Sequence, residues 1–578
     1  MIKTILGSVR EYKKDAILTP LFMVGEVAME CTLPLVMAIL IDHMYTESIS
    51  ELLKYGAILL VMALFSLFCG VMSGRYAASA SAGFASNLRH DIFHRVQDFS
   101  FQDVDRFSTS SLITRMTTDV TNVQMAFMMI IRTAVRSPLM LIFSVIMSFR
   151  INSGVAAVFL AVVPILGLGL YLIGHNVFPV FKRIFKKYDA MNNSIQENIN
   201  GIRVVKSFVR ESYETDKFEK TSGEVRKDFR FAERILALNG PVMMFCGYGA
   251  MLAISFIGAR TIVSSGGTEM TPGQLSSFMT YSMQILMSMM MLSMIIVMCS
   301  ISVESMRRIA EVLTTESTLL SPENGKKEVK DGSIDFENVS FRYNGQSGED
   351  ALKNINLHIK SGMTVGIIGS TGSSKTTLIQ LIPRLYDTTE GSVKVAGTDV
   401  REYELEELRK QIAIVLQKNI LFSGTIKDNI KWGNPSATDD EVQEACRAAQ
   451  AHEFIMQREN GYESMIERGG TNVSGGQKQR LCIARALIAK PKVLILDDST
   501  SAVDTRTDAL IRKALSSYLK DTTKLIIAQR VSSVQDSDMI IVMDNGSIVE
   551  SGTHDELLKK KGIYYEVWDS QTNSKEGA

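Results

Sequence analysis

The chain has 578 residues and carries 62 Lys and Arg against 62 Asp and Glu, so its formal net charge is zero. A chain of this length is too long for a single hydrophobic core, and we expect at least two domains. The balanced charge gives no reason to expect nucleic acid as a partner. None of the six cysteines belongs to a C-x-x-C pair, so buried packing is favoured over metal binding or disulfides.

The first half of the chain contains six segments that are apolar and long enough to cross a bilayer, which takes about 20 residues. We expect these spans near residues 17–42, 54–80, 127–149, 155–177, 239–263 and 275–300. The links at 43–53 and 264–274 contain no Lys or Arg, whereas the longer links at 81–126 and 178–238 are basic. By the positive-inside rule, both termini and both long links lie in the cytoplasm.

The two long links are helical in pattern and contain few residues that break helices. They are too polar to be embedded in lipid. We therefore expect them to extend the membrane helices into the cytoplasm, within a transmembrane domain at residues 1–315.

Two carboxylates lie inside the first expected span. Glu26 and Glu30 are four residues apart, so they share one face of a helix. A carboxylate at membrane depth is costly and faces either a cavity or a polar partner. The pair is thus a candidate substrate contact, with pairing inside the helix bundle or a place near the bilayer edge as the alternatives.

The last expected span is rich in methionine at helical spacing. Met suits adaptable apolar surfaces, so a substrate contact and ordinary helix packing are both open. The candidate substrate residues in this span are Met283, Met287, Met290 and Met294. In the second span, Gly70 and Gly74 form a small-x-x-x-small pair, which predicts close helix contact.

A polar segment at residues 316–332 predicts a linker, and residues 333–578 form the second domain. In that domain an apolar run at residues 364–368 predicts a buried strand. It leads into a phosphate-binding pattern: Gly369, Ser370, Thr371, Gly372, Ser373, Ser374, Lys375, Thr376 and Thr377. In a loop of the form G-x-x-x-x-G-K-[ST], backbone N–H groups cradle phosphates, the Lys reaches the β- and γ-phosphates, and the hydroxyl meets Mg²⁺.

One position in this loop departs from the pattern, because Ser374 replaces the last glycine. A Cβ there clashes if the loop needs a conformation that only glycine adopts. The alternative, which we favour, is that the small serine is tolerated and ATP binding is retained.

The stretch from Val473 to Asp504 carries a second group of motifs. Ser474, Gly475, Gly476 and Gln477 form a glycine-rich turn that opens a helix, and a helix N-terminus can face an anion. An apolar run at residues 493–496 predicts a strand that ends at Asp497, where a carboxylate orders Mg²⁺ beside phosphates. Asp498 follows directly.

In order and spacing, these motifs resemble those of the nucleotide-binding domain of ATP-binding cassette (ABC) transporters. The resemblance implies that Ser474–Gln477 is the signature motif and that Asp504 closes the loop that begins at Ser501. It implies that Tyr343 stacks on adenine and that Gln417 contacts Mg²⁺ together with Thr376 and Asp497. ATP and Mg²⁺ are the implied cofactors.

The first half resembles the exporter subclass of this family. The implied fold is an α-helical transmembrane domain of six spans with long cytoplasmic extensions, fused to an α/β P-loop NTPase domain. In such exporters short coupling helices at the ends of the extensions touch the nucleotide domains. Residues 101–111 and 197–208 stand where these coupling regions are expected.

Two further residues depart from the family's hydrolytic pattern. The family usually has Glu at position 498, where this chain has Asp, and His at position 529, where it has Gln529. Asp is one methylene shorter than Glu, so its carboxylate lies further from the attacking water, and general-base catalysis contributes about 10²–10⁴ in rate. Gln hydrogen-bonds phosphate but cannot carry a titratable proton. Both changes keep binding groups and weaken chemistry, while the signature is intact.

In this family two cassettes meet head to tail, with each ATP between one chain's P-loop and the other chain's signature. The pattern resembles the degenerate-site subunit of bacterial heterodimeric multidrug exporters. It implies a partner half-transporter with intact Glu and His, ATP hydrolysis by the complex, and hydrophobic or amphipathic substrates. A multi-pass protein of the plasma membrane, in contact with membrane lipid, is expected. The alternatives are a lipid or peptide exporter and an ATP-gated regulator without transport.

Overall fold

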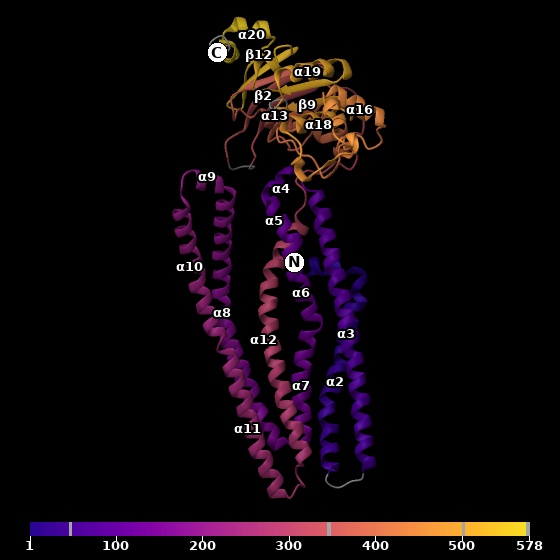
Figure 1. Ribbon diagram of the computed structural model, residues 1–578, viewed down its shortest axis with the longest axis vertical. Helices are drawn as coiled ribbons and strands as arrows, with labels where there is room; N and C mark the ends of the chain where they lie inside the picture. Colours follow the sequence, from indigo (N-terminus) through magenta and orange to yellow (C-terminus); the bar gives the residue numbers. More distant parts are fainter. Residues whose placement is uncertain (45–48, 344–347, 500–502, 574–578) are drawn as a thin grey trace. The chain divides into compact units, whose positions relative to one another are not determined.

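The computed structural model describes residues 1–44, 49–343, 348–499 and 503–573. The chain forms two compact units (Figure 1). The helical unit comprises Met1–Gln97 and Thr109–Thr315, and the α/β unit comprises Asp98–Ser108 and Glu316–Ala578. A short piece of the first half, residues 98–108, is therefore grouped with the second unit.

The helical unit consists of α-helices joined by short turns and by η1 and η2. Its elements are α1 Ile2–Leu6, η1 Gly7–Tyr12, α2 Lys13–His43, α3 Ile49–Gln97, α5 Thr109–Thr114, η2 Arg115–Asp119, α6 Val120–Ile131, α7 Thr133–Ile151, α8 Ser153–Asn200, α9 Ile202–Ser207, α10 Glu211–Leu236, α11 Asn239–Ser265 and α12 Pro272–Thr314. Within the described residues, six helical stretches have the length and composition to cross a membrane. This confirms the prediction of six spans, and α3 and α8 continue beyond the expected span limits into the polar links.

A proline explains how α12 is fixed against α2. Pro34 has no N–H, so the Glu30 carbonyl one turn earlier loses its partner within α2. Gln284 of α12 donates its Nε2 to that carbonyl at 3.2 Å. One turn nearer the start of α12, the Tyr281 hydroxyl donates to the Cys31 carbonyl at 2.7 Å. Because backbone polar groups in apolar surroundings need partners, these two bonds set the register between the helices.

The α/β unit contains three sheets covered by short helices. Its strands are β1 Ile334–Phe341, β2 Leu352–Ile359, β3 Thr364–Gly369, β4 Glu390–Val395, β5 Thr398–Asp399, β6 Ile412–Val415, β7 Gly424–Thr425, β8 Met465–Ile466, β9 Val493–Asp497, β10 Thr523–Ile527, β11 Met539–Asp544 and β12 Ser547–Gly552. Its helices are α4 Phe101–Phe107, α13 Lys375–Leu381, α14 Leu405–Lys410, α15 Ile426–Lys431, α16 Asp439–Ala448, α17 His452–Met456, α18 Gly475–Leu487, α19 Thr505–Tyr518, α20 His554–Lys560 and α21 Ile563–Asn573, with 3₁₀ turns η3 Val400–Glu402, η4 Gly461–Glu463, η5 Arg468–Gly470 and η6 Val531–Ser533.

The central sheet has the strand order β12-β11-β3-β10-β9-β6, parallel except for β12. An antiparallel sheet, β2-β1-β4-β5, and the pair β7-β8 complete the unit. Side chains along β9 alternate between two hydrophobic cores, with Leu494 and Leu496 in one and Val493 and Ile495 in the other. Helix α18 packs in the first core and α13 in the second, so these helices cover opposite faces of the sheet.

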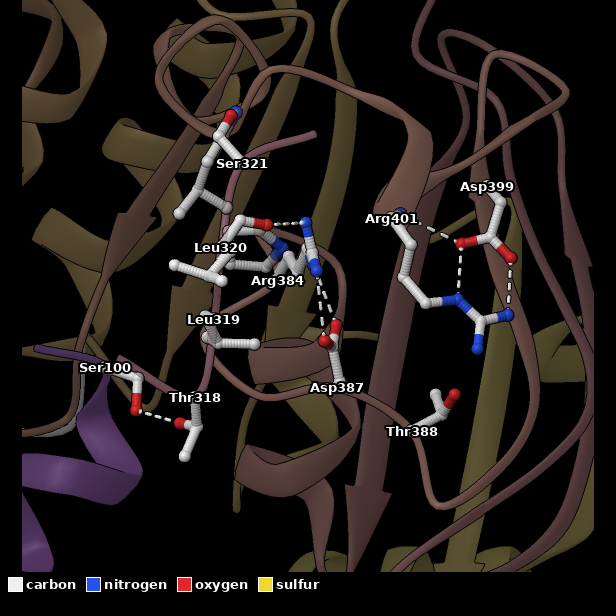
Figure 2. A network of polar contacts seen from close by, with 12 residues as sticks. Ser100, Thr318, Leu319, Leu320, Ser321, Arg384, Asp387, Thr388, Asp399 and Arg401 are labelled. Carbon is white, nitrogen blue, oxygen red and sulfur yellow. Dashed lines mark hydrogen bonds and ion pairs between the residues drawn. The ribbon is translucent and has the colours of Figure 1, made fainter. Parts of the chain in front are cut away.

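The capping residues of helix α4 are hydrogen-bonded to the segment that follows α12. Ser100 is its N-cap, and Asp103 completes a capping box. The buried Asp103 carboxylate also accepts from the Thr318 backbone N–H at 3.1 Å. The Ser100 and Thr318 hydroxyls lie 2.6 Å apart, as Figure 2 shows. The residues after α12 are thereby tied to α4.

The same segment is anchored to the α/β unit by a buried arginine. Arg384 donates from Nη1 to the Leu320 carbonyl at 3.2 Å and from Nε to Asp387 at 2.8 Å, as Figure 2 shows. The Leu405 N–H donates to the Ser321 hydroxyl at 2.9 Å. Residues 318–321 are thus a segment held on the α/β unit by hydrogen bonds, which we call the 318–321 strap.

Candidate nucleotide site

The candidate site lies at the carboxyl edge of the central sheet. The loops after β3, β6, β9 and β10 all leave from this edge because these strands are parallel. Ile527 at the end of β10 pairs with Ile367 of β3 and Asp497 of β9. Ligands of such sheets bind at the carboxyl ends of the strands. The fold thus brings together the residues that were predicted from four separate parts of the sequence.

The loop from Gly369 to Ser374 has the form of a phosphate cradle. Lys375 points back along it, with Nζ donating to the Gly369 carbonyl at 2.9 Å, the Ser370 carbonyl at 2.7 Å and the Ser373 hydroxyl at 3.1 Å. Burial lowers the pKa of Lys375 below its usual value. A Cβ on Gly369 would lie 2.2 Å from the Met543 carbonyl oxygen, so only glycine fits there. Thr371 and Gly372 complete the loop, and both are exposed.

Ser374 holds the conformation that the missing glycine would adopt. Its φ of 68° and ψ of 24° are left-handed, and it caps α13 without a side-chain hydrogen bond. For an L-residue this conformation costs about 1–2 kcal/mol. The loop shape is therefore kept with serine, at a local cost in strain.

A hydroxyl and a carboxylate meet where Mg²⁺ is predicted. Thr376 Oγ1 donates to Asp497 Oδ2 at 2.9 Å, and burial raises the pKa of Asp497. Oxygen ligands of this kind suit Mg²⁺, which is usually held by one or two protein groups together with substrate phosphates and water. Within the described residues no group of three or more His, Cys, Asp or Glu side chains could hold a metal.

The two departures at positions 498 and 529 contact each other. Gln529 donates Nε2 to Asp498 Oδ2 at 2.9 Å, and the Gln417 side chain also hydrogen-bonds Asp498. Burial raises the pKa of Asp498, and the bond from Gln529 opposes that rise. Asp498 itself has a left-handed φ of 47°. Its carboxylate is thus engaged by amides on the two neighbouring loops.

Tyr343, predicted to stack on adenine, stands beside the start of α13. Its hydroxyl shares a 2.8 Å hydrogen bond with Thr377 Oγ1, and its ring meets Tyr386 edge-on at 5.3 Å. The side chain is 40% exposed, so part of the ring faces solvent. Adenine stacking stays a prediction.

The signature residues begin α18, on the other face of the sheet from the P-loop helix. Ser474 is the N-cap, with its Oγ accepting from the Gln477 N–H at 3.3 Å and its N–H donating to Gln477 Oε1 at 3.0 Å. Ser474 and Gly475 are exposed, and Gly476 is half-buried. Asp504 caps α19, accepting from the Thr507 N–H at 3.0 Å, while Ser501 and Ala502 lie outside the described residues.

In the helical unit, Glu26 and Glu30 are paired through a residue that was not predicted. Arg136 of α7 donates from Nη1 to Glu26 and from Nη2 to both oxygens of Glu30, at 2.9 and 2.8 Å. A signal was present in the sequence, since Arg136 lies within the third predicted span. Pairing inside the helix bundle is one of the alternatives considered above, and a substrate contact stays a prediction.

The structure also places the four candidate methionines of α12 and Gly70 of α3. Met283, Met287, Met290 and Met294 are all between 45% and 61% exposed, so about half of each side chain is uncovered. Gly70 instead makes room for charge, because a Cβ there would lie 3.2 Å from the Glu26 carboxyl carbon. A role of the methionines toward substrate stays a prediction.

Comparisons with known proteins agree with this architecture. Residues 17–289 match the family described as ABC transporter transmembrane region, and residues 352–501 match ABC transporter. The chain is 35% identical over 570 residues to the uncharacterized ABC transporter ATP-binding protein YfiB of Bacillus subtilis, covering 98% of each chain. The chain belongs to the ABC transporter family.

More distant relatives extend the comparison. An ATP-dependent lipid A-core flippase of Syntrophus aciditrophicus is 30% identical over 92% of this chain and 88% of its own length. A solved bacterial Atm1-family ABC exporter with ATP bound shares the fold, with a TM-score of 0.82 over 97% of this chain and 98% of its own, at 23% identity. This ABC transporter is a multi-pass membrane protein and an exporter-type half-transporter, and its second domain is an ATP-binding domain.

Proposed function

We propose that this chain is the degenerate-site subunit of a heterodimeric ABC exporter. The observation that carries the proposal is the contact between Gln529 and Asp498 at 2.9 Å. Both residues stand where the family usually has its catalytic His and Glu. The chain would bind ATP at its own P-loop and contribute an intact signature to a partner's hydrolytic site.

Nucleotide binding is supported by the groups that remain. The P-loop keeps its shape, Lys375 keeps its place, and Thr376 and Asp497 offer two oxygens to Mg²⁺. When bound, Mg²⁺ would neutralise charge on the β- and γ-phosphates. The N-terminus of α13 adds backbone N–H donors for the same phosphates. Substitution of the last P-loop glycine changes none of these groups.

Hydrolysis at this site is expected to be weak for two reasons. An attacking water needs an acceptor on Asp498, whose Oδ2 already accepts from Gln529. The Gln529 amide has no titratable proton, so it can orient a phosphate but cannot move a proton. General-base catalysis contributes about 10²–10⁴ in rate, which is the order of the loss that we expect.

A two-chain site is supported by the position of the signature. Helix α18 begins at an exposed N-cap and packs in the opposite core from α13. The signature keeps the family pattern and is exposed, so it is available to contact an ATP that is held by the P-loop of another chain. The predicted second coupling region also exposes apolar residues, with Val204 60% and Phe208 73% exposed, which suits docking on a nucleotide domain.

The substrate class is proposed to be hydrophobic or amphipathic. The four exposed methionines of α12 form an adaptable apolar surface inside the membrane span. A lipid substrate is the second candidate, favoured by the likeness to the lipid A-core flippase. We further propose a bacterial plasma-membrane location with both termini cytoplasmic, the domain limits 1–315 and 333–578, and a linker at 316–332.

The proposal is tested by ATPase activity of the purified full-length chain, alone and co-purified with the partner that it captures from its native membrane. We expect the chain alone to bind ATP and hydrolyse it negligibly, and the complex to be active. Robust turnover by the chain alone, abolished by Asp498→Asn, would reject the heterodimer. Dye efflux and lipid flipping by the complex in proteoliposomes separate the two substrate classes.

A further inference from the structure

The backbone on either side of Arg530 is held by a residue of the last helix. Gln571 of α21 accepts from the Val531 N–H through Oε1 at 2.9 Å and donates from Nε2 to the Gln529 carbonyl at 2.9 Å. One amide thus spans the segment that carries Gln529, 42 residues earlier in the chain.

Helix α21 is fixed independently of this contact. Its first N–H groups, on Ile563 and Tyr564, donate to Glu550 at 2.7 and 3.2 Å. Tyr564 is fully buried in the core that also contains Val531, and its hydroxyl lies 2.6 Å from His554 Nδ1. Removing the Gln571 amide would therefore leave the helix in place.

The contact requires a neutral amide of this length. A primary amide supplies a donor and an acceptor side by side, which matches a carbonyl and an N–H two residues apart. An ionised carboxylate can only accept, so it would face the Gln529 carbonyl without a proton between them. Asn is one methylene shorter than Gln. The chemistry of Gln571 is thus matched to its two partners.

Gln529 is consequently held from two sides. Its backbone carbonyl is bound by Gln571, and its side chain reaches Asp498 at the end of β9. We propose that Gln571 is a positioning residue that fixes Gln529 toward the γ-phosphate of ATP, so that the C-terminal helix sets the discrimination between ATP and ADP. This inference rests on the proposed nucleotide site. The γ-phosphate is the group by which ATP differs from ADP, so the effect is expected in the affinity for ATP alone.

The test measures ATP and ADP affinities of the purified full-length chain by displacement of trinitrophenyl-ATP, with Mg²⁺ present. Gln571→Ala is expected to weaken ATP binding about fivefold, the size of one lost hydrogen bond, with ADP affinity unchanged. Thr572→Ala is the matched control, because the Thr572 hydroxyl bonds to the Trp568 carbonyl within α21. This control should keep the affinities of the unaltered chain.

Gln571→Glu provides a second readout. Its carboxyl, once protonated, again donates to Gln529 and accepts from Val531, so ATP affinity should recover as the pH is lowered. The unaltered chain, measured over the same pH range, corrects for titration of Asp498 and of the phosphates. An unchanged ratio of ATP to ADP affinity in Gln571→Ala, an equal loss of both affinities, or no pH recovery in Gln571→Glu would overturn the inference. Failure of the unaltered chain to bind ATP would instead overturn the proposed function, and the inference with it.

Discussion

Single residues decide what the nucleotide site can do. Ser374 adopts a left-handed backbone conformation that glycine adopts without steric cost. Asp498 and Gln529 are hydrogen-bonded to each other through their side chains. In each case the geometry of a binding site is retained. Under the proposed function, Ser374 lowers stability, the residues at 498 and 529 lower the rate of hydrolysis, and phosphate is still bound.

Ser374→Gly is expected to stabilise the chain by up to about 1 kcal/mol, because release of the left-handed strain outweighs the entropy cost of glycine. Both tryptophans, Trp432 and Trp568, lie in the α/β unit, so their fluorescence during denaturation reports that unit. ATP affinity should stay equal or rise. Destabilisation by this change would show that serine makes a favourable contact in the loop.

The double variant Asp498→Glu with Gln529→His is expected to raise ATP hydrolysis by the chain alone by about 10² or more, since it restores the missing proton-transfer groups. Each single variant should give less. Phosphate release by the purified chain measures the effect. A double variant as inactive as the unaltered chain would mean that another feature limits hydrolysis.

Arg136→Met is expected to reduce sharply the yield of monodisperse protein, because it leaves Glu26 and Glu30 without their cation. Loss of one partner from a fully buried ion pair costs about 3–5 kcal/mol, and this group, in which the Arg136 side chain is 33% exposed, should lose less. Arg136→Lys should recover part of the yield, and Arg150→Met, at the exposed end of the same helix, is the control. Gel filtration in detergent gives the readout, and normal behaviour of Arg136→Met would contradict the pairing.

At the scale of elements, short segments are held by contacts between distant parts of the chain. The 318–321 strap is bound to α4 through Thr318 and to the α/β unit through Arg384. Burial opposes ionisation of Asp103, but hydrogen bonds from Ser100 and Thr318 outweigh it and keep the pKa of Asp103 below its usual value. The strap and α4 thus share one carboxylate.

The lowered pKa of Asp103 makes the stability of the α/β unit depend on pH. A carboxyl whose pKa is lower in the folded state stabilises the fold at pH values above its unfolded-state pKa of about 3.9. This contribution is lost as the pH falls through the folded-state pKa. Asp103→Asn should therefore lower the stability of the α/β unit by about 2 kcal/mol at neutral pH, and the difference should shrink below about pH 4. Tryptophan fluorescence during denaturation at several pH values measures this difference. A difference independent of pH would contradict the role assigned to the charge.

The elements that the sequence predicted best are those with a local pattern. The apolar runs that became β3 and β9 and the spans of α2, α3 and α11 were predictable because periodicity and length are local properties. The partnership of Arg136 with two glutamates and the bond from Gln571 to the Gln529 loop were not predicted. Each depends on packing between segments far apart in sequence, which no local pattern encodes.

Considered as a whole and within the residues that the structure describes, this ABC transporter combines six helical stretches able to span a membrane with an ATP-binding domain whose P-loop and signature belong to opposite faces of one sheet. Such an arrangement suits two unequal sites shared with a second chain. We propose that this chain holds ATP at its own P-loop without hydrolysing it.

Vanadate trapping with radiolabelled azido-ATP tests this proposal, because the photoreactive base labels the chain whose P-loop domain holds the nucleotide. In the cold, where nucleotide binds without turnover, both this chain and its partner should be labelled. After turnover with vanadate, which traps the product of hydrolysis, we predict label on the partner and almost none on this chain. Trapped label on this chain equal to that on the partner would contradict the account.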